Sequence, residues 1–133
     1  MVTVRFDLGT GDQRWADILD TPGNLSEYGR DVAVAGDRVY ATGISGPSWF
    51  GSYLGNDTLL DLPLDYVTVA YVAGDGLRAW TARDNPDGAS PARPASIAAD
   101  GERVYVTGLI NDLVFDPLSK RRGASVATVA YAA

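Results

Sequence analysis

Apolar and polar residues alternate along most of this chain in short runs that end at glycine, proline or aspartate. Residues 66–72, Tyr-Val-Thr-Val-Ala-Tyr-Val, follow this pattern and are rich in the β-branched and aromatic side chains that favour strands. The turn sequence Gly-Asp-Gly follows at 74–76, and residues 77–83 continue with Trp80 in their middle. This arrangement predicts a β-hairpin.

Three further pairs of short runs, each with turn residues between them, predict three more hairpins. They occupy residues 2–7 with 14–20, residues 31–45, and residues 95–110. Gly36 and Asp37 are expected at one corner, and Asp100 and Gly101 at another, because both residue types tolerate the positive φ of a tight turn. No segment of usable length shows a helical period, so we expect almost no helix. The predicted connections are residues 21–30, 46–65, 85–93 and 111–124.

The predicted hairpins recur at a fixed spacing. Val-Thr-Val-Arg-Phe at residues 2–6 returns 65 positions later as Val-Thr-Val-Ala-Tyr, and Trp15 returns as Trp80. At the same offset, Arg-Val-Tyr-Ala-Thr-Gly at 38–43 returns as Arg-Val-Tyr-Val-Thr-Gly at 103–108. A period of this size indicates supersecondary units that bury their faces against one another.

A shorter copy, Thr-Val-Ala-Tyr, lies at residues 128–131. We therefore expect a single all-β module over residues 1–133, a length sufficient for one domain with its own core. Its repeat units lie at approximately 1–65, 66–125 and, in part, 126–133.

The composition excludes several kinds of chemistry. The chain has no cysteine and no histidine, which excludes disulfides, thiolate nucleophiles, cysteine-ligated metals and the usual general base. A net charge of −6 disfavours nucleic acid and anionic membrane surfaces as partners. No apolar stretch approaches the roughly 20 residues needed to span a bilayer. Met1 leads directly into a strand-like run, so we expect no export signal in this chain.

The order of the strand sequences adds a family resemblance. Asp-Tyr-Val-Thr-Val-Ala-Tyr at 65–71 is followed by Trp80 and then by Ala-Ala-Asp-Gly-Glu-Arg-Val-Tyr-Val-Thr-Gly at 98–108. In this order the units resemble the bacterial β-propeller repeat family. Phe-Asp-Leu-Gly-Thr-Gly at 6–11, ahead of Trp15, is similar to the related quinoprotein-type repeat. The resemblance implies four-stranded antiparallel blades and, if the chain is a fragment, an extracellular or cell-surface parent protein.

The resemblance also implies an order for the strands within a blade. From the innermost strand outward, the four strands are residues 31–36, 38–44, 66–72 and 77–84. The chain then begins and ends at a third strand and holds nine strands, which amounts to about two blades cut out of phase. Closed propellers have 4 to 8 blades. Either several copies therefore assemble into one propeller, or the chain is part of a longer one.

The candidate binding residues lie in segment 46–65, which has no counterpart in the repeat. Rigid aromatic side chains beside carboxylates are typical of loops that bind sugars or proteins. The alternative is that this segment covers a blade edge or a subunit contact. The residues are Trp49, Phe50, Tyr53 and Asp57.

Other residues that could carry function have a structural interpretation. Trp15 and Trp80 recur once per unit, as packing between blades requires, although a stacking platform for a ligand would also explain them. The oxygen-rich residues 84–88 lack the alternating spacing of a calcium loop, so a local turn in which Asn or Asp caps the backbone is the stronger interpretation.

We therefore predict a non-catalytic β-propeller module that acts as a scaffold for binding and assembly, without a cofactor or a metal. Its expected partners are further copies of itself and a protein or carbohydrate ligand. Two alternatives stay open. One is a fragment of a quinoprotein-like or carboxylate-dependent propeller enzyme, and the other is a lectin-like module that binds sugar through the loop around Trp49.

Overall fold

The computed structural model describes residues 1–22, 25–47, 64–86, 88, 91–116 and 121–133. These residues form nine strands and no helix, which confirms the all-β prediction. The strands are β1 (Val2–Phe6), β2 (Gln13–Ile18), β3 (Leu25–Ala35), β4 (Arg38–Pro47), β5 (Asp65–Val72), β6 (Arg78–Asp84), β7 (Ala92–Ala99), β8 (Arg103–Asp116) and β9 (Arg121–Ala132).

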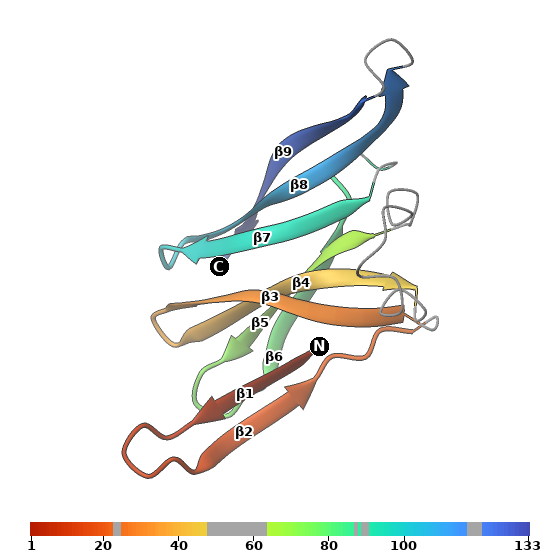
Figure 1. Cartoon of the computed structure of the whole chain (residues 1–133). Helices are drawn as coiled ribbons and strands as arrows, with labels where there is room; N and C mark the ends of the chain where they lie inside the picture. Colours follow the sequence, from red (N-terminus) through yellow and green to blue (C-terminus); the bar gives the residue numbers. More distant parts are fainter. Residues whose placement is uncertain (23–24, 48–63, 87, 89–90, 117–120) are drawn as a thin grey trace.

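The strands make three antiparallel sheets that stack face to face (Figure 1). The N-terminal sheet is β1-β2, the central sheet is β3-β4-β5-β6 and the C-terminal sheet is β7-β8-β9, in that strand order. Within each sheet, strands that follow one another in the chain are neighbours. The two larger sheets are therefore antiparallel meanders with a blade-like strand order, and the central sheet has four strands.

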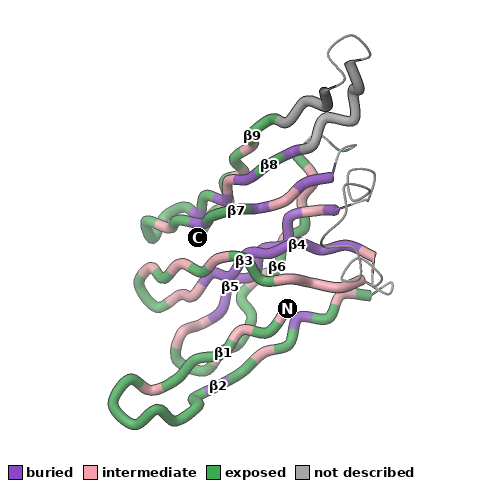
Figure 2. Tube along the Cα trace, viewed as in Figure 1, coloured by how far each residue is buried: buried purple, intermediate pink, exposed green. Residues whose placement is uncertain are grey.

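The central sheet is buried on both faces because the other two sheets cover it. β4 and β5 are almost continuously buried along their lengths (Figure 2), whereas a sheet with one solvated face would show alternation. One face packs Tyr71 against Trp15 of the N-terminal sheet. The opposite face packs Tyr40 and Tyr66 against Val106 of the C-terminal sheet.

Several strands extend into segments that the sequence predicted as connections, and β3, β8 and β9 extend the farthest. β3 begins at Leu25, inside the predicted connection 21–30. β8 continues to Asp116 and β9 begins at Arg121, both inside segment 111–124. The prediction was wrong here because backbone pairing with a neighbouring strand continues beyond the residues that have strand-like composition.

The tight turn between β7 and β8 lies one residue later than predicted. The N–H of Asp100 donates to the carbonyl oxygen of Arg103 at 3.1 Å, so Gly101 and Glu102 form the tip. Gly101 has φ +94°, as such a tip requires. The Asp100 carboxylate accepts from the N–H groups of Glu102 and Arg103 at 2.9 and 2.8 Å, which lowers its pKa. Asp100 is therefore the cap of the turn.

Two glycines in β4 and β8 face β-bulges in the preceding strand. Register shifts mark these bulges in β3 and in β7. A Cβ on Gly43 would collide with the carbonyl oxygen of Tyr28, and a Cβ on Gly108 would collide with that of Arg93. The close approach of the two backbones explains why a glycine follows threonine at both places.

Candidate functional site

The predicted binding residues Trp49, Phe50, Tyr53 and Asp57 lie outside the described residues, so the binding loop stays a prediction. The polar and aromatic clusters that the structure does describe lie mainly where one sheet contacts the next.

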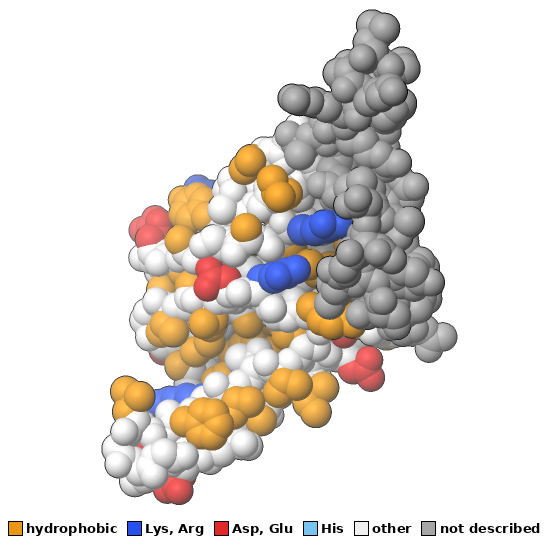
Figure 3. All heavy atoms as spheres, in the orientation of Figure 1, with side chains coloured by type: hydrophobic (Ala, Val, Ile, Leu, Met, Phe, Trp, Pro, Cys, Tyr) orange, Lys and Arg blue, Asp and Glu red, His pale blue; other side chains and the backbone are white. Residues whose placement is uncertain are grey.

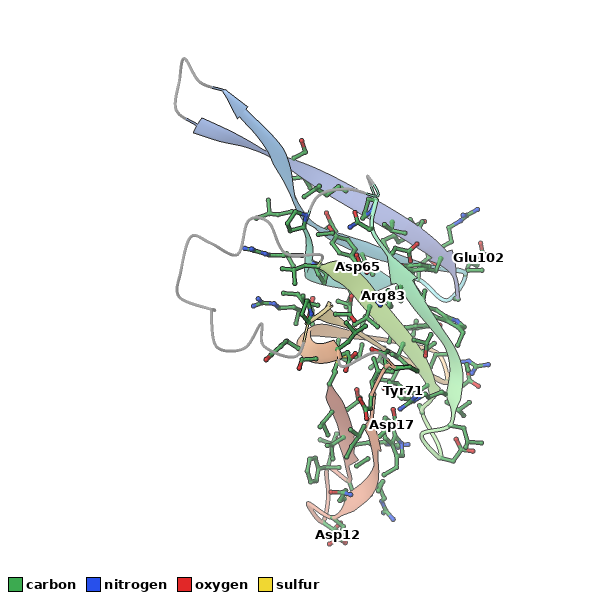
Figure 4. All side chains as sticks on the ribbon, turned by 90° about the vertical axis from the view of Figure 1, so that its right-hand side faces the viewer. Asp12, Asp17, Asp65, Tyr71, Arg83 and Glu102 are labelled. Atoms are coloured by element: carbon green, nitrogen blue, oxygen red, sulfur yellow. The ribbon has the colours of Figure 1, made fainter. Side chains whose placement is uncertain are left out.

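The first cluster joins the N-terminal and central sheets. Alternation along β2 places Trp15 and Asp17 on the face that covers the central sheet. The Asp17 carboxylate accepts from the Tyr71 hydroxyl at 3.0 Å and from Arg78 Nε at 2.7 Å, and Figure 4 shows Asp17 beside Tyr71. The hydrogen bond to Asp17 raises the pKa of Arg78, and burial raises the pKa of Tyr71. Asp17 therefore links β2 to both β5 and β6.

The second cluster joins the central and C-terminal sheets. The ring centroid of Trp80 lies 6.1 Å from that of Tyr40 in the same sheet and 5.5 Å from that of Tyr131 in β9. The Tyr131 hydroxyl donates to Asp84 Oδ2 at 2.7 Å. Burial, together with this carboxylate, raises the pKa of Tyr131. The combination of tryptophan, tyrosine and aspartate thus matches that of the first cluster, although Asp17 and Asp84 occupy different positions after their tryptophans.

A third contact joins the first strands of the central and C-terminal sheets. Asp31 Oδ2 accepts from the N–H of Ile97 at 3.0 Å and from the Ser96 hydroxyl at 2.9 Å. Its other oxygen accepts from the N–H of Val32 at 2.8 Å. The hydrogen bond from Ile97, supported by those from Val32 and Ser96, lowers the pKa of Asp31. Asp31 thus connects the bulge in β3 to the corresponding bulge in β7.

A fourth cluster lies within the central sheet, where β5 begins and β6 ends. Asp65 accepts from Arg83 Nε at 2.6 Å and from Asn85 Nδ2 at 3.1 Å, and Figure 4 shows Asp65 and Arg83 close together. The N–H of Gly88 donates to the Asn85 side-chain oxygen at 3.1 Å. This is the local cap expected for the oxygen-rich segment 84–88.

Three of these clusters join one sheet to the next, and the fourth joins β5 to β6 within the central sheet. Asp17 and Asp65 each contact an arginine, and Asp31 accepts several hydrogen bonds. Among the described residues there is no group of three or more acidic side chains that could hold a metal ion. The hydrogen bonds of the first three clusters strengthen the contacts between the sheets.

A groove lies between the N-terminal and central sheets, beside the edge of β1 that is not paired with β2. It consists of two hollows of about 360 and 490 Å³. Figure 3 shows hydrophobic side chains over the β1-β2 hairpin and the sheet next to it. We call it the β1 groove, and its apolar lining residues include Val2, Val4, Phe6, Val32, Val34 and Val39.

Comparisons with protein-family models, with curated proteins and with solved structures found no match to this chain. Among the described residues, no helix is long and apolar enough to cross a membrane.

The sequence interpretation did not identify Asp17, Asp31 or Arg78, and it did not identify the β1 groove. Long-range ion pairs leave no local pattern, because their partners are far apart in the chain. The role of Tyr131 could have been found, since it matches Tyr71 in the repeated Thr-Val-Ala-Tyr sequence.

Proposed function

We propose that this chain is a β-propeller module that acts as a non-catalytic scaffold for binding and assembly, and that it completes its propeller by association with further copies. The observation that carries this proposal is the similarity of the two contacts between sheets. Trp15 packs on Tyr71 and Trp80 packs on Tyr131, with ring centroids 5.5 Å apart in both cases. One stacking arrangement therefore serves twice along the chain, as it does from blade to blade in a propeller.

The outer face of the N-terminal sheet supports the proposal. Phe6 precedes Tyr71 by the repeat spacing of 65 residues. Tyr71 is 0% exposed because the N-terminal sheet covers it, whereas Phe6 is 56% exposed. Val2 and Val4, the counterparts of the buried Val67 and Val69, are exposed in the same way. This face has the side chains of a contact between sheets without a sheet on it.

The outer face of the C-terminal sheet has the complementary character. Tyr105 is the counterpart of Tyr40, but Tyr40 is 1% exposed and Tyr105 is 39% exposed. Leu109 is likewise exposed, although its counterpart Ile44 is fully buried. The two ends of the stack thus expose different faces, and the counterparts of both faces are covered by a neighbouring sheet elsewhere in the chain. Association of one end with the other end of a second copy is therefore head to tail.

Strand positions indicate how such ends would meet. The N-terminal sheet supplies third and fourth strands, and the C-terminal sheet supplies first, second and third strands. Together they complete one blade and leave one third strand surplus. Two, three or four copies would then form four, six or eight blades, which lies within the range of closed propellers.

The mass of the protein in solution tests this proposal. Light scattering over a range of concentrations should give multiples of the 14.1 kDa chain. Phe6→Asp places a charge on the outer face and should shift the protein toward the monomer. Leu8→Asp is the matched control, because Leu8 is fully exposed in the β1-β2 turn and should leave the mass unchanged. A 14.1 kDa species at every concentration would contradict self-association.

A further inference from the structure

We infer that the β1 groove is an acceptor site for a β-strand, and that its occupant is β8 of a second copy, which replaces its own β9 with β1. This inference rests on the proposed function and specifies the interface through which copies associate.

The free edge of β1 has backbone groups available for pairing. The N–H of Leu19 donates to the carbonyl oxygen of Met1 at 2.8 Å, which makes these two residues a hydrogen-bonded pair in the ladder with β2. Hydrogen-bonded and non-hydrogen-bonded pairs alternate in antiparallel sheets. The N–H and C=O groups of Val2 and Val4 therefore point away from β2 and toward the β1 groove. An edge of this kind is a template for another strand.

No sheet of the described residues covers the β3 residues that line the groove, whereas the central sheet covers the corresponding part of β7. Val32 in β3 corresponds to Ile97 in β7 at the repeat spacing. Ile97 is 7% exposed because the central sheet covers it, whereas Val32 is 56% exposed. Val34, farther along β3, is exposed as well. The first and second strands of a blade would cover these β3 residues. The N-terminal sheet lacks both, because it consists of a third and a fourth strand.

The central sheet identifies the strand that belongs beside β1. There the third strand, β5, pairs with the second strand, β4, and Thr68 lies opposite Thr42. Thr3 corresponds to Thr68, and Thr107 of β8 corresponds to Thr42, so β8 would pair with β1 with Thr3 opposite Thr107. The same register places Phe6 opposite Val104 and Val4 opposite Val106.

Within the chain, β9 already holds the place beside β8. Val104 pairs with Tyr131, and Thr107 pairs with Thr128 with their hydroxyl oxygens 3.1 Å apart. β1 offers Phe6 in place of Tyr131 and Thr3 in place of Thr128. The exchange therefore replaces one third strand with another of similar sequence, although the five residues of β1 form a shorter ladder with β8 than the twelve residues of β9.

The exchange also adds contacts that β9 does not provide. β1 brings β2 with it, which supplies the fourth strand that the C-terminal sheet lacks. In the expected register, Tyr105 of the second copy faces the central sheet over Val32 and Val34, as Tyr40 faces the C-terminal sheet. The exposed apolar residues of both partners are then buried together, and burial of apolar area favours association.

Disulfide trapping tests the register. The chain has no cysteine, so an introduced pair reports on itself alone. Thr3 and Thr107 would form a non-hydrogen-bonded pair, with Cα atoms about 4.5 Å apart, within the span of a disulfide. The variant Thr3→Cys with Thr107→Cys should form covalent dimers and larger species on mild oxidation, seen on non-reducing gels. The single variants must keep the wild-type mass under reducing conditions.

The matched control locks β9 in place. Thr107→Cys with Thr128→Cys should form a disulfide within one chain, keep β9 on β8 and lower the mass seen by light scattering, and reduction should restore the wild-type mass. Association of the oxidised control at the wild-type mass, or assembly of the Thr3/Thr107 variant without crosslinks, overturns the strand exchange and leaves self-association standing. A wild-type chain that stays at 14.1 kDa overturns both.

Discussion

Trp15 lies against Tyr71 with ring centroids 5.5 Å apart and ring planes tilted by 32°, so that an indole of β2 packs on a phenol of β5. The indole Nε1 also donates to the carbonyl oxygen of Ala73 at 3.0 Å, and the phenol donates to Asp17. Both aromatic residues are therefore held by a polar contact at one end and an apolar contact along the ring. This is the geometry through which the N-terminal sheet is attached to the central sheet.

A double-mutant cycle on Trp15 and Tyr71 should reveal this attachment. Trp15→Ala is expected to cost about 3 to 5 kcal/mol of unfolding free energy, the range for loss of a buried tryptophan. The coupling between Trp15→Ala and Tyr71→Ala should be about 0.5 to 1.5 kcal/mol, the range for aromatic pairs. Urea denaturation gives the unfolding free energy of the wild type, the two single variants and the double variant. Strictly additive losses would contradict a direct contact between the two rings.

Gly76 is expected to be intolerant of alanine for a reason that Gly11 does not share. Both glycines have φ near +75°, so each alanine variant loses about 1 to 2 kcal/mol through backbone strain. A Cβ on Gly76 would also lie 2.6 Å from the ring of Trp15, whereas no described atom lies within 4 Å of a Cβ on Gly11. Gly76→Ala should therefore lose about 1 to 3 kcal/mol more than Gly11→Ala in dilute monomer. Equal losses would show that Trp15 does not pack on this turn.

The repeat made the order of strands predictable from the sequence. Alternation in residues 66–72 and the tryptophan at 80 predicted β5 and β6 close to their observed bounds, because this hairpin carries both a periodic pattern and a turn signal. The strand ends were less predictable. β3 begins at Leu25 because its backbone pairs with Pro47, a partner that local composition does not reveal.

The contacts between sheets were only partly predictable. The recurrence of tryptophan indicated a packing role, and Trp15 and Trp80 both lie at such contacts. The partners that complete each contact, Asp17 with Arg78 and Asp31 with Ile97, depend on the relative placement of whole sheets. That placement follows from three-dimensional packing, so it has no counterpart in the periodicity of one strand.

The raised pKa values of Tyr71 and Tyr131 predict a loss of stability in alkali. Burial raises both values above 10.0, the ordinary value for tyrosine, so the native fold favours the neutral phenol. Their contribution is fully present below pH 10 and is lost as the pH rises through the folded-state values. Tyr131→Phe keeps the ring against Trp80 but removes the ionisable group. Its urea midpoint should therefore fall less steeply above pH 10 than that of the wild type, and parallel curves would argue against burial of this phenol.

The lowered pKa of Asp31 predicts the opposite behaviour in acid. Hydrogen bonds from the N–H groups of Ile97 and Val32 and from the Ser96 hydroxyl favour the carboxylate, so the folded-state pKa lies below the ordinary 3.8. This contribution is fully present above the unfolded value and is lost as the pH falls through the folded-state value.

Asp31→Asn should therefore lower stability at neutral pH and flatten its dependence on pH below about 4, since the amide does not ionise. Asp12→Asn is the control, because Asp12 lies at the exposed β1-β2 turn, far from the C-terminal sheet (Figure 4). Urea midpoints of the three proteins across the acid range make the comparison. If Asp31→Asn follows the wild type throughout that range, Asp31 does not connect β3 to β7 in solution.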